Sequence, residues 1–304
     1  MNGRSVNGRW LVLRPKCRDR MNQNEFNKKL WTLGREVHTG KCRLAPVDVG
    51  TIYHTSKNVR VPKIFGRQNG TVEVFQSDSM MSAWLHRPWR YNKKMYPGMQ
   101  YKGVNLEGLY RPARDVIALE TANLEYCFSR FANDNGVTCQ LPLLTYGVCR
   151  RGLSMGVLVR SLASPLTLLE LHQNKKLFEK YLSLRGERRE EYFEFMARTL
   201  GRSVRRLFDV HLCKGDMTLD KITSEGELID FEPALDLSFN GVVLTELPNF
   251  RSVMLERLFS SIFGFVEDKN KFTEYFSHAF FDKHVRISPK RYVEDILRRY
   301  YKLK

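Results

Sequence analysis

KGDMTLDKITSEGELIDFE, residues 214–232, is the stretch that decides which fold the rest of the sequence has to fit. Its pattern predicts a loop that carries Asp216 and Asp220, a short strand, a turn at 224–226 and a second strand that ends at Asp230. A hairpin of this kind brings Asp230 close to the other two carboxylates. Clustered carboxylates are typical of a magnesium–nucleotide site, where one binds the metal and another orients or deprotonates the acceptor hydroxyl. A solvated acidic hairpin is the alternative that this stretch leaves open.

The sequence before this hairpin predicts strands with one embedded helix. The alternating pattern at 99–103 indicates a strand that ends in a turn at Gly103. Asp115 is placed to cap a helix that runs from Val116 to about Phe131. Further strands are predicted at 61–65 and 71–75, where Asn69-Gly70 favours a hairpin between them, and at 141–148 and 156–160.

After residue 165 the periodicity becomes helical, and amphipathic stretches continue almost to the C-terminus. Another helix is predicted at 24–37. We therefore expect an α+β protein with a two-lobed protein-kinase-like fold. Its N-terminal lobe would have an antiparallel sheet and one main helix, and its C-terminal lobe would be mostly helical. A parallel doubly wound sheet fits badly because strands and helices do not alternate. The predicted parts are an N-terminal extension of unclear role at 1–60, an N-lobe at 61–160 and a helical C-lobe at 161–304 with the catalytic hairpin at 214–233.

Composition restricts the partners without choosing one. The 304 residues carry a formal net charge of +17, from 50 Lys and Arg against 33 Asp and Glu. Basic residues spread along the chain suit polyanions such as nucleotide phosphates, acidic proteins or nucleic acid. The six cysteines form no C-x-x-C pair, and residues 1–20 lack a signal-peptide core, so we expect a cytoplasmic protein with reduced thiols. Nucleic-acid binding is supported by charge alone, since no nucleic-acid module is recognisable.

Lys102 and Glu125 are a candidate ion pair upstream of the hairpin. Lys102 ends a predicted strand, and Glu125 lies inside the predicted helix that follows. In a kinase-like fold a strand lysine contacts the nucleotide phosphates, and a carboxylate on the helix orients that lysine. Surface Lys and Glu residues are common, so the position of the pair upstream of the hairpin is what supports it.

In this order and spacing the residues resemble the selenoprotein O family of kinase-like protein adenylyltransferases. The similarity begins at Tyr101-Lys102-Gly103, continues through Glu125, resumes at Gly215 and Asp220, and ends at Ile229-Asp230 and Pro233. It covers about half of the chain, and no single piece of it is specific. There is a weaker similarity to aminoglycoside-phosphotransferase-like kinases, which place their catalytic base where this chain has Asp216.

The resemblance implies ATP and Mg²⁺ as cofactors and transfer of AMP to a protein hydroxyl. Lys102 would contact phosphate, with Glu125 holding it, and Arg160 matches a phosphate-binding arginine. Asp220 would be the base and a metal ligand, and Asp230 the principal metal ligand. The chain departs from the family at Lys221, where the family has a metal-binding Asn. An ammonium beside a magnesium ion costs Coulomb energy unless it contacts phosphate itself.

Three functions follow as hypotheses. The first is an ATP-dependent protein or peptide adenylyltransferase that acts on Ser, Thr or Tyr, with an acidic substrate. The second is phosphoryl transfer from the same site with Asp216 as base. The third is a catalytically weak pseudokinase that binds nucleotide or a partner, and Lys221 is its main support. In each of the three, Asp230 is expected to be essential for any transfer.

Overall fold

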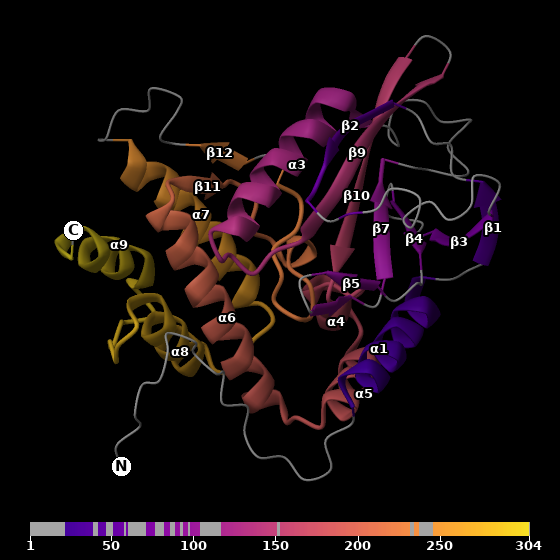
Figure 1. Cartoon of the computed structure of the whole chain (residues 1–304). Helices are drawn as coiled ribbons and strands as arrows, with labels where there is room; N and C mark the ends of the chain where they lie inside the picture. Colours follow the sequence, from indigo (N-terminus) through magenta and orange to yellow (C-terminus); the bar gives the residue numbers. More distant parts are fainter. Residues whose placement is uncertain are drawn as a thin grey trace, which may run out of the picture.

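An antiparallel sheet forms one side of the molecule, and a group of helices forms the other (Figure 1). The computed structural model describes residues 22–38, 42–46, 51–57, 59, 71–76, 82–85, 89–91, 94–96, 98–103, 117–150, 153–231, 234–236 and 246–303. In this part of the chain, no helix combines the length and the apolar character needed to cross a membrane.

The large sheet has the strand order β1-β3-β4-β7-β10-β9-β2, and β8 pairs with β10. All of its pairings are antiparallel. Its strands are β1 (Cys42–Pro46), β2 (Thr51–Thr55), β3 (Thr71–Gln76), β4 (Ser82–Leu85), β7 (Gly98–Lys102), β8 (Ile117–Ala118), β9 (Leu141–Arg150) and β10 (Leu153–Leu162). A separate small hairpin joins β5 (Trp89–Tyr91) to β6 (Lys94–Tyr96). Strands β7 and β10 are neighbours near the middle of this sheet, so residues of these two strands lie side by side.

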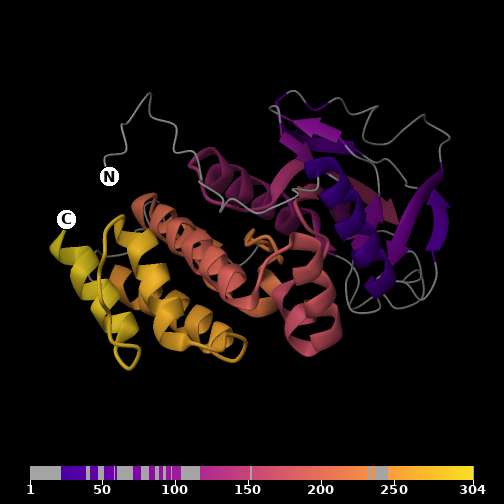
Figure 2. The same ribbon diagram turned by 90° about the horizontal axis from the view of Figure 1, so that it is seen from below.

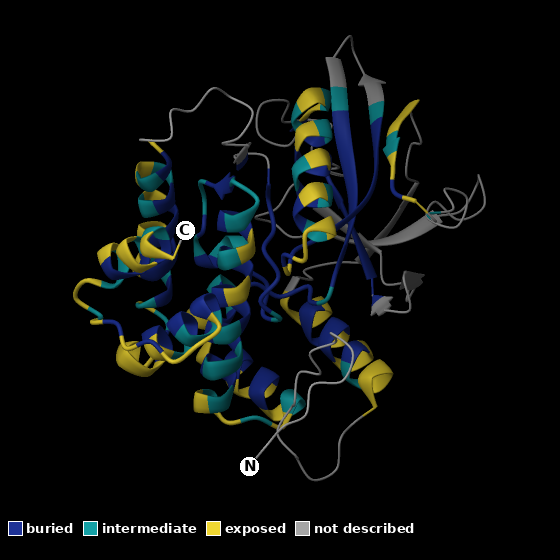
Figure 3. Ribbon diagram, turned by 60° about the vertical axis from the view of Figure 1, so that its left-hand side comes forward, coloured by how far each residue is buried: buried dark blue, intermediate teal, exposed yellow. Residues whose placement is uncertain are grey.

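Helix α3 (Leu119–Asp134) lies against β9 and β10. Close approach is possible because Gly156 faces the start of this helix. A Cβ atom at Gly156 would lie 2.6 Å from the Cα of Leu119 and 2.8 Å from the Cβ of Ala122. The helix presents Ala122, Glu125 and Tyr126 to the protein interior, while its opposite face is exposed (Figure 3). The sheet therefore receives a buried carboxylate from this helix.

The helical part contains α4 (Leu168–Gln173), α5 (Lys175–Arg185), α6 (Arg189–Asp209), α7 (Leu247–Ile262), α8 (Lys269–Phe281) and α9 (Tyr292–Lys302). Helix α6 lies at its centre and packs against α8. The apolar side chains of α6 recur every three or four residues and are fully buried at Leu200, Val204 and Leu207. Thr167 and Asn174 cap α4 and α5 with side-chain oxygens that accept from the first helical turn.

Helix α1 (Gln23–His38) precedes the first strand of the large sheet in the chain, and it packs beside α5 of the helical part (Figure 2). Leu30 and Leu33 belong to the main core, whose other members come mostly from the helices after residue 165. The stretch 24–37 was expected to be helical, and it is.

The α+β class is confirmed: one part has an antiparallel sheet and one main helix, and the other is mostly helical. Strands β9 and β10 confirm the predictions at 141–148 and 156–160, and α7, α8 and α9 lie where amphipathic stretches predicted them. Strands β1 and β2 come from residues before 61 and join the same sheet. The limits of the predicted lobes stay predictions.

Two local expectations are corrected. Strand β3 was predicted to pair with residues 61–65, but its two edges are used by β1 and β4. Residues 61–70 lie outside the described part of the chain. The helix predicted from Val116 begins instead at Leu119, because Ile117 and Ala118 pair with β10 as β8. Ala118 is its N-cap and makes no side-chain cap, while Asp115 lies outside the described residues.

Candidate functional site

Strand β7 and helix α3 bring a buried lysine and a buried glutamate into contact. Lys102 is the last residue of β7, and the side chain of Glu125 faces the sheet with 0% exposure. The Nζ of Lys102 lies 2.7 Å from Oε2 of Glu125. It also lies 2.8 Å from Oδ1 of Asp230, which belongs to the hairpin more than a hundred residues later. Lys102 therefore joins a strand, a helix and a loop.

Arg160 and Gln140 complete the surroundings of Glu125. The Nη1 of Arg160, on β10, donates to Oε1 of Glu125 at 2.8 Å, and the side-chain amide of Gln140 donates to the same oxygen at 2.9 Å. Burial by itself would raise the pKa of Glu125, but the charges of Lys102 and Arg160 outweigh it and lower the pKa below its ordinary value. Glu125 is consequently an ionised carboxylate inside the protein.

Asp230 is surrounded by three cations. Its Oδ1 accepts from Lys102 at 2.8 Å and from Arg160 at 3.0 Å, and its Oδ2 accepts from Lys221 at 2.7 Å. Burial opposes ionisation of this carboxyl, yet the charges of Lys102, Arg160 and Lys221 hold its pKa well below the ordinary value. The backbone N–H of Asp230 donates to Oε1 of Gln140 at 3.1 Å, which ties the end of the hairpin to the start of β9.

The hairpin that carries Asp230 is held by its own backbone. Ile222 and Leu228 form an antiparallel bridge, and the N–H of Ile229 donates to the carbonyl of Lys221 at 2.9 Å. Gly226 makes the turn with a φ of 76°, a region that side chains with a Cβ rarely adopt. Asp230 itself has a φ of 61°, where Asp is tolerated better than most residues. The hairpin predicted from the sequence is therefore present, with a single bridge in place of two full strands.

Asp216 and Asp220 lie on the loop before the hairpin. Strand β11 (Leu212–Lys214) leads into this loop, and the short 3₁₀ helix η2 (Leu219–Lys221) ends it. The hydroxyl of Thr218 lies 2.9 Å from Oδ1 of Asp216 and 2.6 Å from Oδ1 of Asp220. Asp220 also pairs with Lys221 at 3.2 Å. Among the described residues, no cation forms an ion pair with the carboxylate of Asp216. Asp220 therefore has a positive charge at ion-pair distance, and Asp216 does not.

Lys214 is a buried cation beside this loop. Its side chain has 0% exposure, its ammonium donates to the backbone carbonyl of Asp216, and it lies 5.7 Å from the ring centre of Phe231. Burial lowers the pKa of Lys214 to about 8, although Asp230 and Asp216 act in the opposite direction. Lys214 therefore holds the backbone of Asp216 in place from inside the protein.

The fit of magnesium to this arrangement can be tested on Asp230 and Asp220. Mg²⁺ needs oxygen ligands at about 2.0–2.1 Å in octahedral geometry, and in kinases an Asp and an Asn of this region hold two ions. Here both oxygens of Asp230 accept from cations, and the Lys221 ammonium lies between Asp230 and Asp220. No group of three or more His, Cys, Asp or Glu side chains in the described ranges is arranged to hold a metal ion. The residues as they lie do not fit a two-ion site.

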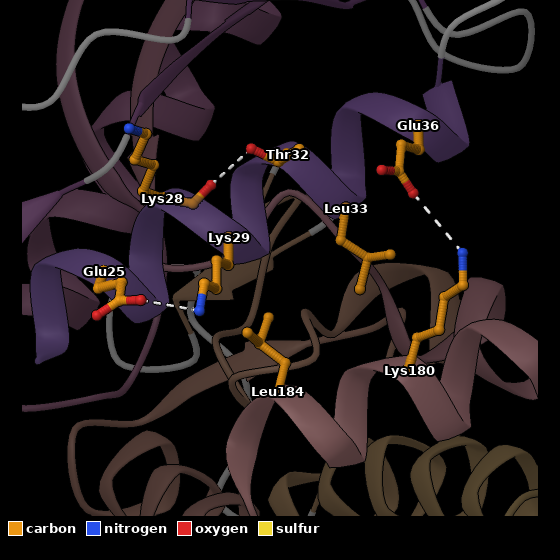
Figure 4. A pocket seen from close by; sticks show the side chains of 8 residues that line it. All are labelled: Glu25, Lys28, Lys29, Thr32, Leu33, Glu36, Lys180 and Leu184. Atoms are coloured by element: carbon orange, nitrogen blue, oxygen red, sulfur yellow. Dashed lines mark hydrogen bonds and ion pairs between the residues drawn. The ribbon is translucent and has the colours of Figure 1, made fainter. Parts of the chain in front are cut away.

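A hollow of about 490 Å³ lies elsewhere, between α1 and α5 (Figure 4). Most of its lining residues are charged or polar, although the surface that they present to the hollow is mainly apolar, and Glu36 pairs across it with Lys180 at 3.8 Å. None of the candidate site residues lines this hollow, so it is separate from the Lys102–Asp230 cluster.

The structure brings together six of the seven residues proposed from the sequence through direct contacts. Lys102, Glu125, Arg160, Asp230, Lys221 and Asp220 form one chain of ion pairs, and Asp216 is joined to it through Thr218. Three polar residues of this network had been assigned no role: Gln140, Thr218 and Lys214. Gln140 has no distinguishing sequence signal, whereas Lys214 and Thr218 each stand two residues from Asp216. The roles of all these residues in binding or catalysis stay predictions.

Strand β7, helix α3 and the hairpin place a strand lysine against a helix glutamate next to a loop aspartate, and protein kinases use these residue types in the same way. No protein-family model matches the sequence, and no curated protein matches it. The solved structures that resemble it include WaaP in complex with acyl carrier protein, with 10% identity, a TM-score of 0.36 and coverage of 84% of this chain and 88% of that one. A Stt7 homologue from Micromonas algae soaked with ATP has 14% identity, a TM-score of 0.35 and coverage of 62% and 55%. At these TM-scores neither likeness bears on function.

Proposed function

We propose that this chain is a kinase-like transferase that binds a nucleoside triphosphate beside Lys102 and transfers a phosphoryl group to a hydroxyl. The observation that carries the proposal is the position of the Lys102 ammonium, 2.7 Å from Glu125 and 2.8 Å from Asp230. A lysine held in this way by a helix carboxylate next to a loop aspartate is the arrangement with which kinases contact nucleotide phosphates.

Asp216 is the residue that would orient the acceptor. Its carboxylate would accept the proton of the attacking hydroxyl, whose oxygen forms a bond to the γ-phosphorus while the bond to the bridging oxygen of the nucleoside diphosphate breaks. Lys214 and Thr218 support this role, because one holds the backbone carbonyl of Asp216 and the other donates to its carboxylate or to that of Asp220. Lys102 would neutralise charge on the phosphates.

Transfer of AMP is the second candidate, and it rests on Asp220 as base. The structure supports Asp220 less well than Asp216, because Asp220 is already compensated by the Lys221 ammonium at 3.2 Å. An acceptor hydroxyl that approaches Asp220 has to compete with this ammonium for the carboxylate. For this reason we favour phosphoryl transfer.

A pseudokinase that binds nucleotide without transferring it is favoured by one specific contact. Lys221 Nζ lies 2.7 Å from Oδ2 of Asp230, the carboxylate on which metal-assisted transfer in kinases depends.

The acceptor in the enzymatic case would be a hydroxyl of an acidic protein or peptide, which suits a chain with a formal net charge of +17. A cytoplasmic location agrees with a nucleoside triphosphate donor.

Intact-mass spectrometry tests the proposal. The protein is incubated with ATP, with and without Mg²⁺, alone and with a mixture of acidic peptides that contain Ser, Thr and Tyr. We expect a phosphate-sized addition that the Asp216→Asn variant does not make. An AMP-sized addition would support adenylyl transfer in its place. Nucleotide binding without any addition would leave the pseudokinase, and absence of binding at millimolar ATP would overturn all three.

A further inference from the structure

The Lys221 ammonium lies between two carboxylates that the sequence analysis assigned to metal. Its Nζ is 2.7 Å from Oδ2 of Asp230 and 3.2 Å from Oδ2 of Asp220. The side chain is 24% exposed, so it has one side toward the protein and one toward solvent. These two contacts hold the positive charge of Lys221 at this place.

A divalent cation cannot share this place without displacing the lysine. A magnesium ion bound to Asp230 or Asp220 would stand a few ångströms from the ammonium, and in a partly buried site the repulsion between them is screened less than at an exposed surface. The other oxygen of Asp230 already accepts from Lys102 at 2.8 Å and from Arg160 at 3.0 Å. Lys221 continues this series of ion pairs, and it stands at the position where kinases use Asn to hold the second ion.

The same ammonium is suited to a phosphate oxygen. An ammonium has three N–H donors, and the two carboxylates use two of them. A lysine commonly binds phosphate as a point charge, as the P-loop lysine does. With Lys102 on the opposite side of Asp230, the site offers two ammonium groups held by one carboxylate.

We propose that the Lys221 ammonium takes the place of a divalent cation at this site, so that the chain binds a nucleoside triphosphate without requiring Mg²⁺. This inference rests on the proposed function, because it concerns the same nucleotide site. A side chain of the protein, in place of a bound metal ion, would then supply the positive charge that neutralises the phosphates. Replacement of Lys221 by Asn would restore a neutral oxygen ligand and with it a need for metal.

Fluorescence titration of the full chain with an N-methylanthraniloyl ATP analogue, in excess EDTA and in millimolar Mg²⁺, tests this. For the wild type we expect dissociation constants that differ by less than about threefold between the two conditions. For Lys221→Asn we expect binding at least about tenfold tighter with Mg²⁺ than with EDTA, since the carboxylates are then open to the ion. Lys221→Arg keeps the positive charge, so whatever its absolute affinity, the ratio of its dissociation constants in EDTA and in Mg²⁺ should stay below about threefold.

Lys180→Asn is the matched control, because it removes one positive charge from α5, where Lys180 pairs only loosely with Glu36 at 3.8 Å. It should show the wild-type insensitivity to EDTA. A wild type that loses about tenfold or more in affinity on addition of EDTA overturns the inference and leaves the proposed function intact. Absence of nucleotide binding in both conditions overturns the proposed function and the inference together.

Electron paramagnetic resonance of Mn²⁺ supplies a measurement that needs no variant. If Lys221 replaces the ion, a mixture of wild-type protein, ATP and Mn²⁺ should contain no more bound Mn²⁺ than ATP and Mn²⁺ alone. If the mixture with protein contains more bound Mn²⁺ than ATP and Mn²⁺ alone, the inference is contradicted. This measurement uses the wild type only, so it stands even when Lys221→Asn fails to fold.

Discussion

The Nζ atom of Lys102 lies 2.7 Å from Oε2 of Glu125, and neither side chain is accessible to more than a small extent. The pair joins the end of β7 to the middle of α3 and is shared with Arg160 and Asp230. Buried charges are costly unless each is compensated, so every member of this network depends on the others. The position of α3 on the sheet is coupled through these charges to the hairpin that carries Asp230.

Glu125→Ala should destabilise the protein by about 3–5 kcal/mol, because it leaves Lys102 and Arg160 buried with one carboxylate fewer. Urea unfolding followed by circular dichroism measures the loss. Glu120→Ala, on the exposed side of the first turn of α3, is the control and should cost less than about 1 kcal/mol. Equal losses for the two variants would show that the Glu125 network contributes no special stability.

If the protein transfers phosphate as proposed, Asp216→Asn should reduce phosphoryl transfer by about 10²–10⁴-fold, since it removes the group that would accept the proton of the acceptor. Asp220→Asn should reduce it less than about tenfold, because Asp220 is paired with Lys221. Single-turnover kinetics under saturating nucleotide compare the two, and nucleotide affinity should change little in either. The opposite order of effects would identify Asp220 as the base.

Lys214 makes stability depend on pH in the alkaline range. Its pKa is lowered from 10.5 to about 8 in the folded protein, so between these values the unfolded chain binds a proton that the folded chain has lost. Stability therefore rises with pH in this window, and below about pH 8 the cost of burying the ammonium is fully present. The free energy of unfolding of the wild type, relative to Lys214→Met, should rise by about 2 kcal/mol from pH 8 to pH 9.5. A difference that stays constant over this range would contradict the prediction.

Gly226→Ala should disrupt the hairpin. It places a side chain at a φ of 76° and brings a Cβ atom to 2.8 Å from Cγ2 of Thr199. Gly186→Ala is the matched control, because its φ is 64° and a Cβ there would meet nothing within 4 Å. Gly186→Ala should cost only the backbone term of about 1–2 kcal/mol, and Gly226→Ala should cost more. Thermal denaturation of the two variants measures the difference, and equal costs would show that Thr199 moves aside freely.

Element types could be predicted from the sequence where periodicity is local. The apolar spacing of Leu200, Val204 and Leu207 predicted a helix because side chains three and four residues apart share one face, and these residues form the buried face of α6. The start of α3 could not be predicted in this way. Ile117 and Ala118 pair with β10, and a pairing across so many residues leaves no local signal.

The sequence by itself determined the hairpin at 214–233, the sequence of strands with one helix followed by a helical part, and the carboxylates and cations available to a site. Turn geometry, alternation and helical periodicity depend on neighbours in the chain, and these were sufficient for that much. Only the tertiary structure decided which cation meets which carboxylate. Arg160 and Gln140 reach Glu125 from β10 and from the start of β9, and Lys221 closes on Asp230 because the hairpin folds back. Electrostatic pairing in a buried site depends on distances of a few ångströms, which are set by packing between elements far apart in the chain.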